Sequence, residues 1–380
     1  MTDQEREGAT PAVLPEDDRR AADTGEAAAG ADEAASANPE GEQAGGYAGL
    51  AGLARRYRPT IIAYGLVLVL FAIGTIHTPG FAGWTNIRTL LVFGSFIGII
   101  GFGQTLCILT GGIDLSVPWT LTGAAVLSSV LLKGSDANFV PVCLLVAGLA
   151  IGIGLINGIG VAYVGVPPII MTLGMNGALQ GLLLVYTNGG ISSSPPQGLV
   201  NAVTDQVLGI PVILLSWIVV AVIAIVLLSA TTFGRRLYAV GTNASAAKLA
   251  GVRVQRVLLV PYIVSALGAS LAGLLLMGFT GQAYLTMGDP YLFTGAVAVA
   301  VGGTSILGGK GHYVGTIAGA LILTLVSALL PLFWTSAAGV QIADGAILLG
   351  AVYAAGRRAR GNGTGWLRHS LASFVAGNKA

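Results

Sequence analysis

Few side chains in this sequence could do acid–base or metal chemistry. The chain has 380 residues, of which 17 are Asp or Glu and 3 are His, and twelve of the acids precede residue 43. His77 and His369 fall in a predicted loop and in the C-terminal tail, so no set of nucleophile, base and orienting group can be assembled. Cys107 and Cys143 lie in apolar runs, which predicts buried free thiols. We therefore expect neither catalysis nor a metal site.

The stretch GGIDLS places Asp114 between two long apolar runs, and two interpretations compete. In the first it is a tight inner turn, in which Gly111 and Gly112 end one helix, Asp114 or Ser116 caps the next, and Pro118 occupies its first turn. In the second it is a break inside the bilayer, because only about 15 apolar residues follow from Pro118, and broken helices are tolerated where they line a cavity. An acid at that depth is costly, which makes it a candidate site.

Several other polar side chains fall inside or beside predicted membrane spans. In lipid such groups either form hydrogen bonds across helices or face a translocation pathway, and both interpretations stay open for each of them. The candidate pathway residues are Gln104, Asp114, Ser116, Asn157, Thr172, Asn176 and Thr304.

The composition predicts a membrane protein with an acidic tail. Apolar residues make up 54% of the chain, charged residues only 9%, and glycine occurs 57 times, which is more hydrophobic surface than a soluble core can hide. Residues 1–46 are rich in Ala, Glu and Gly and should be disordered. The first hydrophobic run begins only at Thr60, far from the start, which argues against a secretory signal. The acidic N-terminal tail and the only mildly basic remainder of the chain also argue against a nucleic-acid partner.

Apolar runs long enough to cross a bilayer as helices recur along the rest of the chain. They predict an all-α integral membrane protein, a polytopic bundle of about ten transmembrane helices. Glycines four residues apart, as in Gly154 and Gly158 or Gly315 and Gly319, should let these helices pack closely. The predicted spans are 60–76, 87–110, 115–132, 139–163, 167–187, 210–230, 257–279, 291–306, 312–330 and 336–355.

The positions of Lys and Arg predict the orientation. Arg55, Arg56 and Arg58 put the N-terminus in the cytoplasm, because cytoplasmic loops retain basic residues. Ten spans then place the longest basic loop, residues 231–256, and the C-terminus in the cytoplasm of a bacterial inner membrane. The expected organisation is a disordered acidic tail at 1–46, a basic juxtamembrane segment at 47–59, a permease domain at 60–355 and a cytoplasmic tail at 356–380.

The basic inner loop should contain a short helix of its own. Asn243 or Ser245 can cap a helix over residues 246–250, which Gly251 ends in a left-handed turn. Such a small-faced helix is suited to dock on another protein, or it is an interfacial helix held by basic residues near anionic lipid. The candidate docking residues are Gly241, Asn243, Ser245, Ala246, Ala247, Leu249 and Gly251.

Four stretches in order, TLCILTGGIDLSVPWTLTGAA, NGIGVAYVGVPPIIMTLGMNGALQGL, FGRRLYAVGTNASAAKLAGVRV and AVAVAVGGTSILGGKGHYVGTIAGAL, carry a family resemblance. They resemble the permease subunits of ribose/xylose-type sugar ABC importers over roughly residues 60–355. The resemblance implies that the inner loop rests on a separate ATPase, which uses ATP and Mg²⁺, while this chain binds no cofactor. It also implies an extracellular or periplasmic sugar-binding protein and a permease homodimer.

The expected function is therefore the permease subunit of an ATP-driven importer of a monosaccharide. Two alternatives remain. One is an ion-coupled secondary transporter, with Asp114 and Asp344 as coupling-ion sites. The other is an ABC permease for nucleosides or branched-chain amino acids. Two departures from the family pattern stand out, because relatives usually have a glutamate where this chain has Ser245, and often a basic residue near Asp344.

Overall fold

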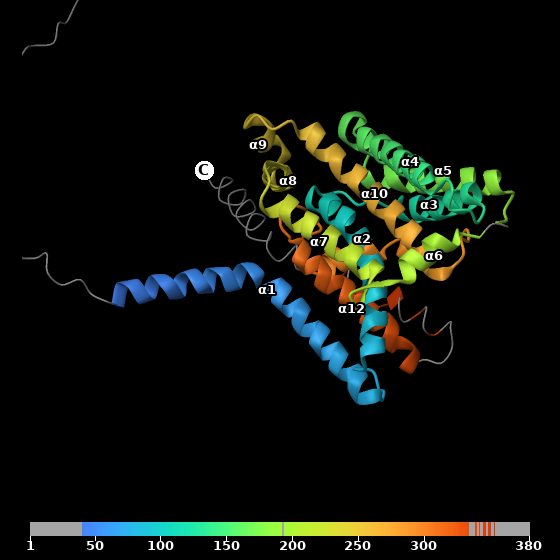
Figure 1. Ribbon diagram of the computed structural model, residues 1–380. Coiled ribbons are helices and arrows are strands. Elements are labelled where there is room, and N and C mark those ends of the chain that lie inside the picture. The colour runs from blue at the N-terminus through green and yellow to red at the C-terminus, as the bar shows by residue number, and fades with distance from the viewer. Residues whose placement is uncertain are drawn as a thin grey trace, which may run out of the picture. The chain divides into compact units, whose positions relative to one another are not determined.

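The membrane-spanning part of the chain is a bundle of helices. The computed structural model describes residues 40–191 and 194–333, together with seven single residues between 339 and 353 (Figure 1). Residues 1–56 and 57–380 form separate units, and the second contains the helix bundle. Of the predicted N-terminal tail at 1–46, residues 1–39 lie outside the described residues and residues 40–46 belong to a helix; the predicted tail at 356–380 and Asp344 also lie outside the described residues.

Helices account for almost all of the described structure, and a single two-stranded hairpin joins α6 to α7. Its strands are antiparallel, with Gln206 opposite Pro211 and Val207 opposite Ile210. The elements are α1 (Glu40–His77), α2 (Trp84–Leu109), α3 (Val117–Leu132), α4 (Phe139–Ile159), a π-helical turn (Gly160–Val164), α5 (Pro168–Thr187), α6 (Gln197–Thr204), β1 (Gln206–Val207), β2 (Ile210–Pro211), α7 (Val212–Ser229), α8 (Thr232–Thr242), α9 (Ala244–Leu249), α10 (Val254–Thr280), a 3₁₀ turn (Asp289–Tyr291), α11 (Thr294–Val301) and α12 (Tyr313–Phe333).

Seven helices in the described part are long and apolar enough to cross a membrane, which confirms the predicted class of all-α polytopic membrane protein. The predicted span at 291–306 is wrong as a full crossing. There the chain forms α11, whose eight residues rise only about 12 Å, well short of the hydrocarbon thickness. Gly303, with φ +94°, ends α11 in a left-handed turn. The predicted span at 336–355 lies largely outside the described residues.

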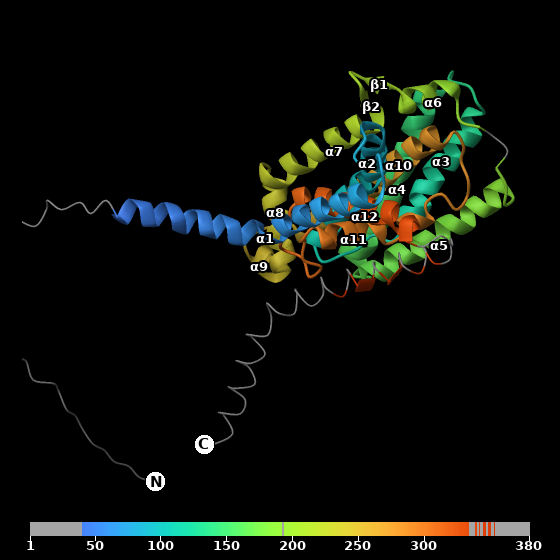
Figure 2. The same ribbon diagram turned by 90° about the horizontal axis from the view of Figure 1, so that it is seen from below.

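Helix α2 is enclosed by the others. It contacts α7, α10, α11 and α12, and Figures 1 and 2 show it crossing the middle of the bundle. In the apolar stretch of α2 that could cross the membrane 89% of residues are buried, whereas in the corresponding stretch of α5 only 11% of residues are buried. Apolar side chains of α5 that are exposed in this chain, such as Ile170 and Val185, are suited to contact lipid. Any polar group on α2 must therefore find its hydrogen bonds inside the protein.

Glycines bring the helices together at backbone distance, as the four-residue spacing predicted. A Cβ at Gly154 of α4 would lie 2.5 Å from Cα of Ile263 in α10, and one at Gly319 of α12 would overlap the carbonyl of Ala298 in α11. Side chains larger than hydrogen do not fit at these crossings without moving a helix. Helix α10 also packs along α3, so it joins α2, α3 and α4 into one unit.

Candidate functional site

The segment between α2 and α3 begins where α2 ends in a Schellman motif. The amide of Gly112 donates to the carbonyl of Cys107, and that of Gly111 donates to Ile108, each over 2.9 Å. Gly111 has φ +81°, a conformation that glycine adopts without steric cost. The predicted helix-ending role of Gly111 and Gly112 is confirmed.

The segment is buried rather than exposed. Asp114 and Ser116 have no exposed surface, and Leu115 is also buried. Helix α3 begins only at Val117, and Pro118 lies in its first turn as predicted. Several backbone amides and carbonyls therefore lie in the protein interior without helical hydrogen bonds. They need hydrogen-bond partners from the surrounding helices.

Gln104 of α2 satisfies the backbone of Asp114 from one side. Its Nε2 donates to the carbonyl of Asp114 over 2.5 Å, and its Oε1 accepts from the Asp114 amide over 3.3 Å. The side-chain amide of Gln104 thus forms hydrogen bonds with both the backbone amide and the backbone carbonyl of Asp114, as a neighbouring strand would. Gln104 is itself buried, so it has no water to compete with this pair.

Helix α5 satisfies the segment from the other side. Thr172 Oγ1 accepts from the Leu115 amide over 3.0 Å, and this hydroxyl lies 2.9 Å from the carbonyl of Pro168 and 3.3 Å from that of Ile113. One turn further along α5, Asn176 Oδ1 accepts from the Trp119 amide over 3.4 Å. The polar side chains of α5 therefore hold both the break and the start of α3.

The Asp114 side chain turns back on its own segment. Its Oδ1 accepts from the amide of Ser116 over 3.0 Å and from the Ser116 hydroxyl over 2.6 Å. Asn157 of α4 donates to that hydroxyl over 2.9 Å, which links α4 to the same network. Asp114, not Ser116, therefore supplies the local side-chain acceptor immediately before α3. Hydrogen bonds to an ionised carboxylate are shorter and stronger than those to a neutral acceptor.

The second oxygen of Asp114 is unsatisfied. Asp114 Oδ2 has no hydrogen bond of normal geometry in the described part of the chain, and its neighbour is the hydroxyl of Ser265 on α10, which interacts with the Asp114 carboxyl and has no other partner there. No Lys or Arg of the described ranges pairs with this acid. An unpaired buried acid is costly, and such groups gather at functional sites. Ser265 is the residue that sequence reasoning missed, and its only signal was a hydroxyl inside an apolar run.

The structure brings together six of the seven candidate pathway residues. Five of them bond to or within the break between α2 and α3, and Asn176 bonds to the first turn of α3. Thr304 is separate, because it follows α11 and its buried hydroxyl has no partner among the described residues. The geometry gives the six a structural task, which is to hold the break and the start of α3. A role in contacting solute stays a prediction for all seven.

The inner loop forms the short helix that the sequence predicted. Asn243 caps α9 by accepting from the Ala246 amide over 3.0 Å, and Ser245 lies within the helix instead of capping it. At the other end Gly251 has φ +81°, and its amide donates to the carbonyl of Lys248 over 3.0 Å. Ala247 is buried while Leu249 is 91% exposed, so α9 presents an uncovered leucine.

Three glycine-containing segments meet between α9 and the break. A Cβ at Gly241, at the end of α8, would overlap the carbonyl of Leu109, the last residue of α2. That carbonyl accepts from the amide of Gly309 over 2.9 Å. Tyr238 of α8 donates its hydroxyl proton to the carbonyl of Gly311 over 2.7 Å. We call these contacts the glycine junction. Through it, α8 touches the residue that immediately precedes the break.

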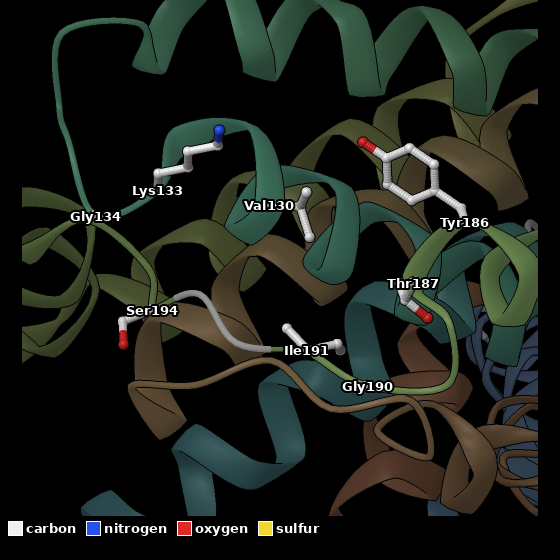
Figure 3. A pocket seen from close by; sticks show the side chains of 8 residues that line it. All are labelled: Val130, Lys133, Gly134, Tyr186, Thr187, Gly190, Ile191 and Ser194. Atoms are coloured by element: carbon white, nitrogen blue, oxygen red, sulfur yellow. The ribbon is translucent and has the colours of Figure 1, made fainter.

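A cavity of about 560 Å³ lies elsewhere, between the end of α3 and the end of α5. Figure 3 shows the amino group of Lys133 and the hydroxyl of Tyr186 on the two helices that border it. Its polar groups include an amino group and hydroxyls, which can form hydrogen bonds with a bound molecule. The lining residues are Val130, Lys133, Gly134, Tyr186, Thr187, Gly190, Ile191 and Ser194.

Comparison with known proteins gives the family. Residues 86–353 match the family described as branched-chain amino acid transport system / permease component, and the chain belongs to this family. It is an ABC transporter permease, a multi-pass membrane protein and a transporter component.

Similar proteins include several import permeases. The chain is 37% identical over 295 residues to the ribose import permease protein RbsC of Bacillus subtilis, covering 75% of this chain and 89% of that one. It is 36% identical over 296 residues to RbsC of Escherichia coli K12, covering 75% and 90%. It is also 34% identical over 278 residues to the autoinducer 2 import system permease protein LsrC of Salmonella paratyphi B, covering 72% and 80%. No solved structure matches the chain significantly.

Thr172→Val tests whether α5 holds the break. Valine has nearly the same shape but cannot accept from the Leu115 amide, and leaving that amide unpaired should cost about 1–3 kcal/mol. We expect a lower thermal unfolding midpoint for the purified chain in detergent. Thr187→Val is the matched control on the same helix, because its hydroxyl only donates to the carbonyl of Leu183. Equal shifts for the two variants would contradict the assignment.

Proposed function

We propose that this chain is the transmembrane permease subunit of an ATP-driven importer that carries a monosaccharide across the cytoplasmic membrane. A separate ATPase binds at α9 and uses ATP and Mg²⁺, and an extracellular binding protein delivers the solute. Two permease chains pair as a homodimer, with both termini in the cytoplasm. The similarity to the ribose import permeases supports the substrate class, and membership of the permease family supports a separate ATPase and binding protein.

The observation that carries this proposal is the physical link between α9 and the break. Helix α9 is capped at both ends, exposes Leu249, and follows directly on α8. Helix α8 meets the end of α2 at the glycine junction, and α2 leads into the hydrogen-bonded break. A movement imposed on α9 by a partner would therefore reach the break through backbone contacts, which deform less readily than side-chain contacts.

In this proposal the permease transports solute by alternating access. When ATP binding draws two ATPase subunits together, the α9 helices follow and the bundle opens outward to accept solute. Hydrolysis then reverses the movement. Within this cycle Gln104, Thr172 and Asn157 keep the break satisfied while the helices around it shift. The polar cavity at Lys133 lies on the expected outer side, where the binding protein would dock.

An ion-coupled carrier is the second candidate, and one observation favours it. Asp114 is buried and its Oδ2 lacks a partner among the described residues, which is the setting of a coupling-ion site. Vesicles that contain this chain alone distinguish the two functions. Accumulation of labelled ribose driven by a proton or sodium gradient would establish the carrier and overturn the proposal. The similarity to LsrC and the description of the family are also consistent with small solutes other than a monosaccharide.

Leu249→Glu tests the docking of the ATPase. We expect the affinity of the cognate ATPase for the permease to fall at least about tenfold, because a charge would replace an apolar side chain at the centre of the contact. The measurement is co-purification of the ATPase from membranes, together with ATP-dependent uptake of labelled ribose. Leu208→Glu is the control, because Leu208 is 96% exposed on the hairpin expected to face outside. Retained ATPase binding by Leu249→Glu would show that α9 is not part of the interface with the ATPase.

Asp114→Asn tests the acid within the break. The substitution keeps an acceptor for Ser116 but removes the charge that strengthens its two hydrogen bonds. We expect ATP-driven uptake to fall about tenfold, the effect of about 1.4 kcal/mol, while insertion and ATPase assembly stay normal. The control is Asp136→Asn, which changes an exposed acid of the loop before α4. Normal uptake by an assembled Asp114→Asn complex would show that the charge has no role in transport.

A further inference from the structure

A second cavity, of about 480 Å³, opens between α8 and the start of α10. Three of the residues that line it are arginines: Arg236 on α8, Arg253 immediately before α10, and Arg256 in the first turn of α10. We call it the arginine cavity. The positive-inside rule explains why basic residues occur in this loop, but it does not require three of them to line one cavity.

No acid in the described part of the chain neutralises these arginines. No glutamate occurs after Glu42, and none of the aspartates in the described ranges lines the cavity. Asp136 and Asp205 accept from backbone amides in other loops, and Asp114 lies inside the break. Three like charges around one cavity repel one another, so the site favours an anionic occupant that offers several oxygen acceptors.

The start of α10 adds to this positive field. The helix begins at Val254, its N-cap residue Arg253 accepts no side-chain cap hydrogen bond, and its first turn contains no acid. The unpaired amides of a helix N-terminus carry a partial positive charge that attracts anions. Here this contribution reinforces the guanidinium groups and does not define the site by itself.

The other side of the arginine cavity is apolar. Phe233 of α8 and Val257 and Val260 of α10 line it, and α10 continues from there as a membrane span. The cavity therefore lies where the basic surface meets the hydrocarbon-facing part of the chain. A free phosphate would use only the arginines, and an acidic protein loop would leave the apolar wall unused. A phospholipid would fill both parts, with its phosphate on the arginines and its acyl chains along the valines.

We propose that the arginine cavity binds the phosphate head group of an anionic phospholipid of the phosphatidylglycerol or cardiolipin type. This proposal rests on the membrane location of the chain and not on its solute or its ATPase, so it can fail while the transport proposal stands. The bound lipid would tie α8 and the start of α10 to the membrane surface beside α9.

Lipid binding by the purified full chain tests the proposal. Native mass spectrometry would count bound phosphatidylglycerol and phosphatidylcholine for the wild type and for a variant that combines Arg236→Gln, Arg253→Gln and Arg256→Gln. We expect the wild type to prefer phosphatidylglycerol, and the variant to bind it at least about tenfold more weakly, since each basic residue near an anionic surface contributes on the order of 1 kcal/mol. Binding of phosphatidylcholine should not change.

The matched control removes the same charge from residues that do not line the cavity. It combines Arg58→Gln, Arg235→Gln and Lys248→Gln, all on the exposed basic surface. We expect this control to bind phosphatidylglycerol within about threefold of the wild type, because a dispersed surface charge acts weakly at a distance. Should the cavity triple variant fail to fold, the single variants Arg253→Gln and Arg256→Gln are compared with Arg235→Gln in the same way.

Four results would overturn the proposal. The first is equal binding of the two lipids by the wild type, and the second is an equal loss in the cavity and control variants. The third is displacement of phosphatidylglycerol by millimolar inorganic phosphate, which would identify a free-anion site. The fourth is unchanged lipid binding with loss of ATPase assembly in the cavity variant, which would identify the arginines as contacts for an acidic protein surface.

Discussion

The structure depends on satisfying the polar backbone of a helix break that lies inside the protein. Between Leu109 and Val117 the chain has no regular hydrogen bonding, yet Asp114, Leu115 and Ser116 are buried. Each buried amide or carbonyl without a partner would cost about 1–3 kcal/mol, which a marginally stable fold cannot absorb several times over. Side chains from the surrounding helices provide the partners. That requirement fixes where α4 and α5 stand relative to α2 and α3.

The same hydrogen bonds couple movement of the break to movement of the helices around it. The break cannot move by itself, because its partners are attached to Gln104 of α2, Asn157 of α4 and Thr172 of α5. It can move only with those helices. The glycine junction attaches α8 to the end of α2 at a distance that leaves no room for a side chain at Gly241. A displacement of α8 and α9 therefore becomes a displacement of α2, and the buried acid lies immediately beyond it.

Local signals in the sequence were sufficient for most of the long helices and for several of their ends. Apolar runs predicted the spans, Asn243 and Gly251 predicted both ends of α9, and Gly111 predicted the end of α2. The span at 291–306 was wrong because its composition is apolar throughout, while its length as a helix is set by Gly303 and by the turn at Asp289–Tyr291. Hydropathy averages over such interruptions and cannot detect them.

The hydrogen-bond network could not be predicted in the same way. Polar residues within spans could be found, but Thr172 contacts Leu115 across 57 residues, and Gln104 bonds to a backbone and not to another side chain. No pattern in the sequence encodes those pairings, since they arise from the crossing of α2, α3 and α5. Ser265 was missed for the same reason, because an isolated serine in α10 has meaning only once Asp114 lies beside it.

Hydrogen–deuterium exchange of the break tests the central claim most directly. If side chains hold the segment, peptides spanning residues 111–116 should exchange as slowly as the interior of α2, and Thr172→Val should accelerate exchange at Leu115 without changing α2. Exchange of the wild-type segment as fast as that of the exposed loop at 133–138 would contradict the account. It would show that the buried break is not held by the residues assigned to it.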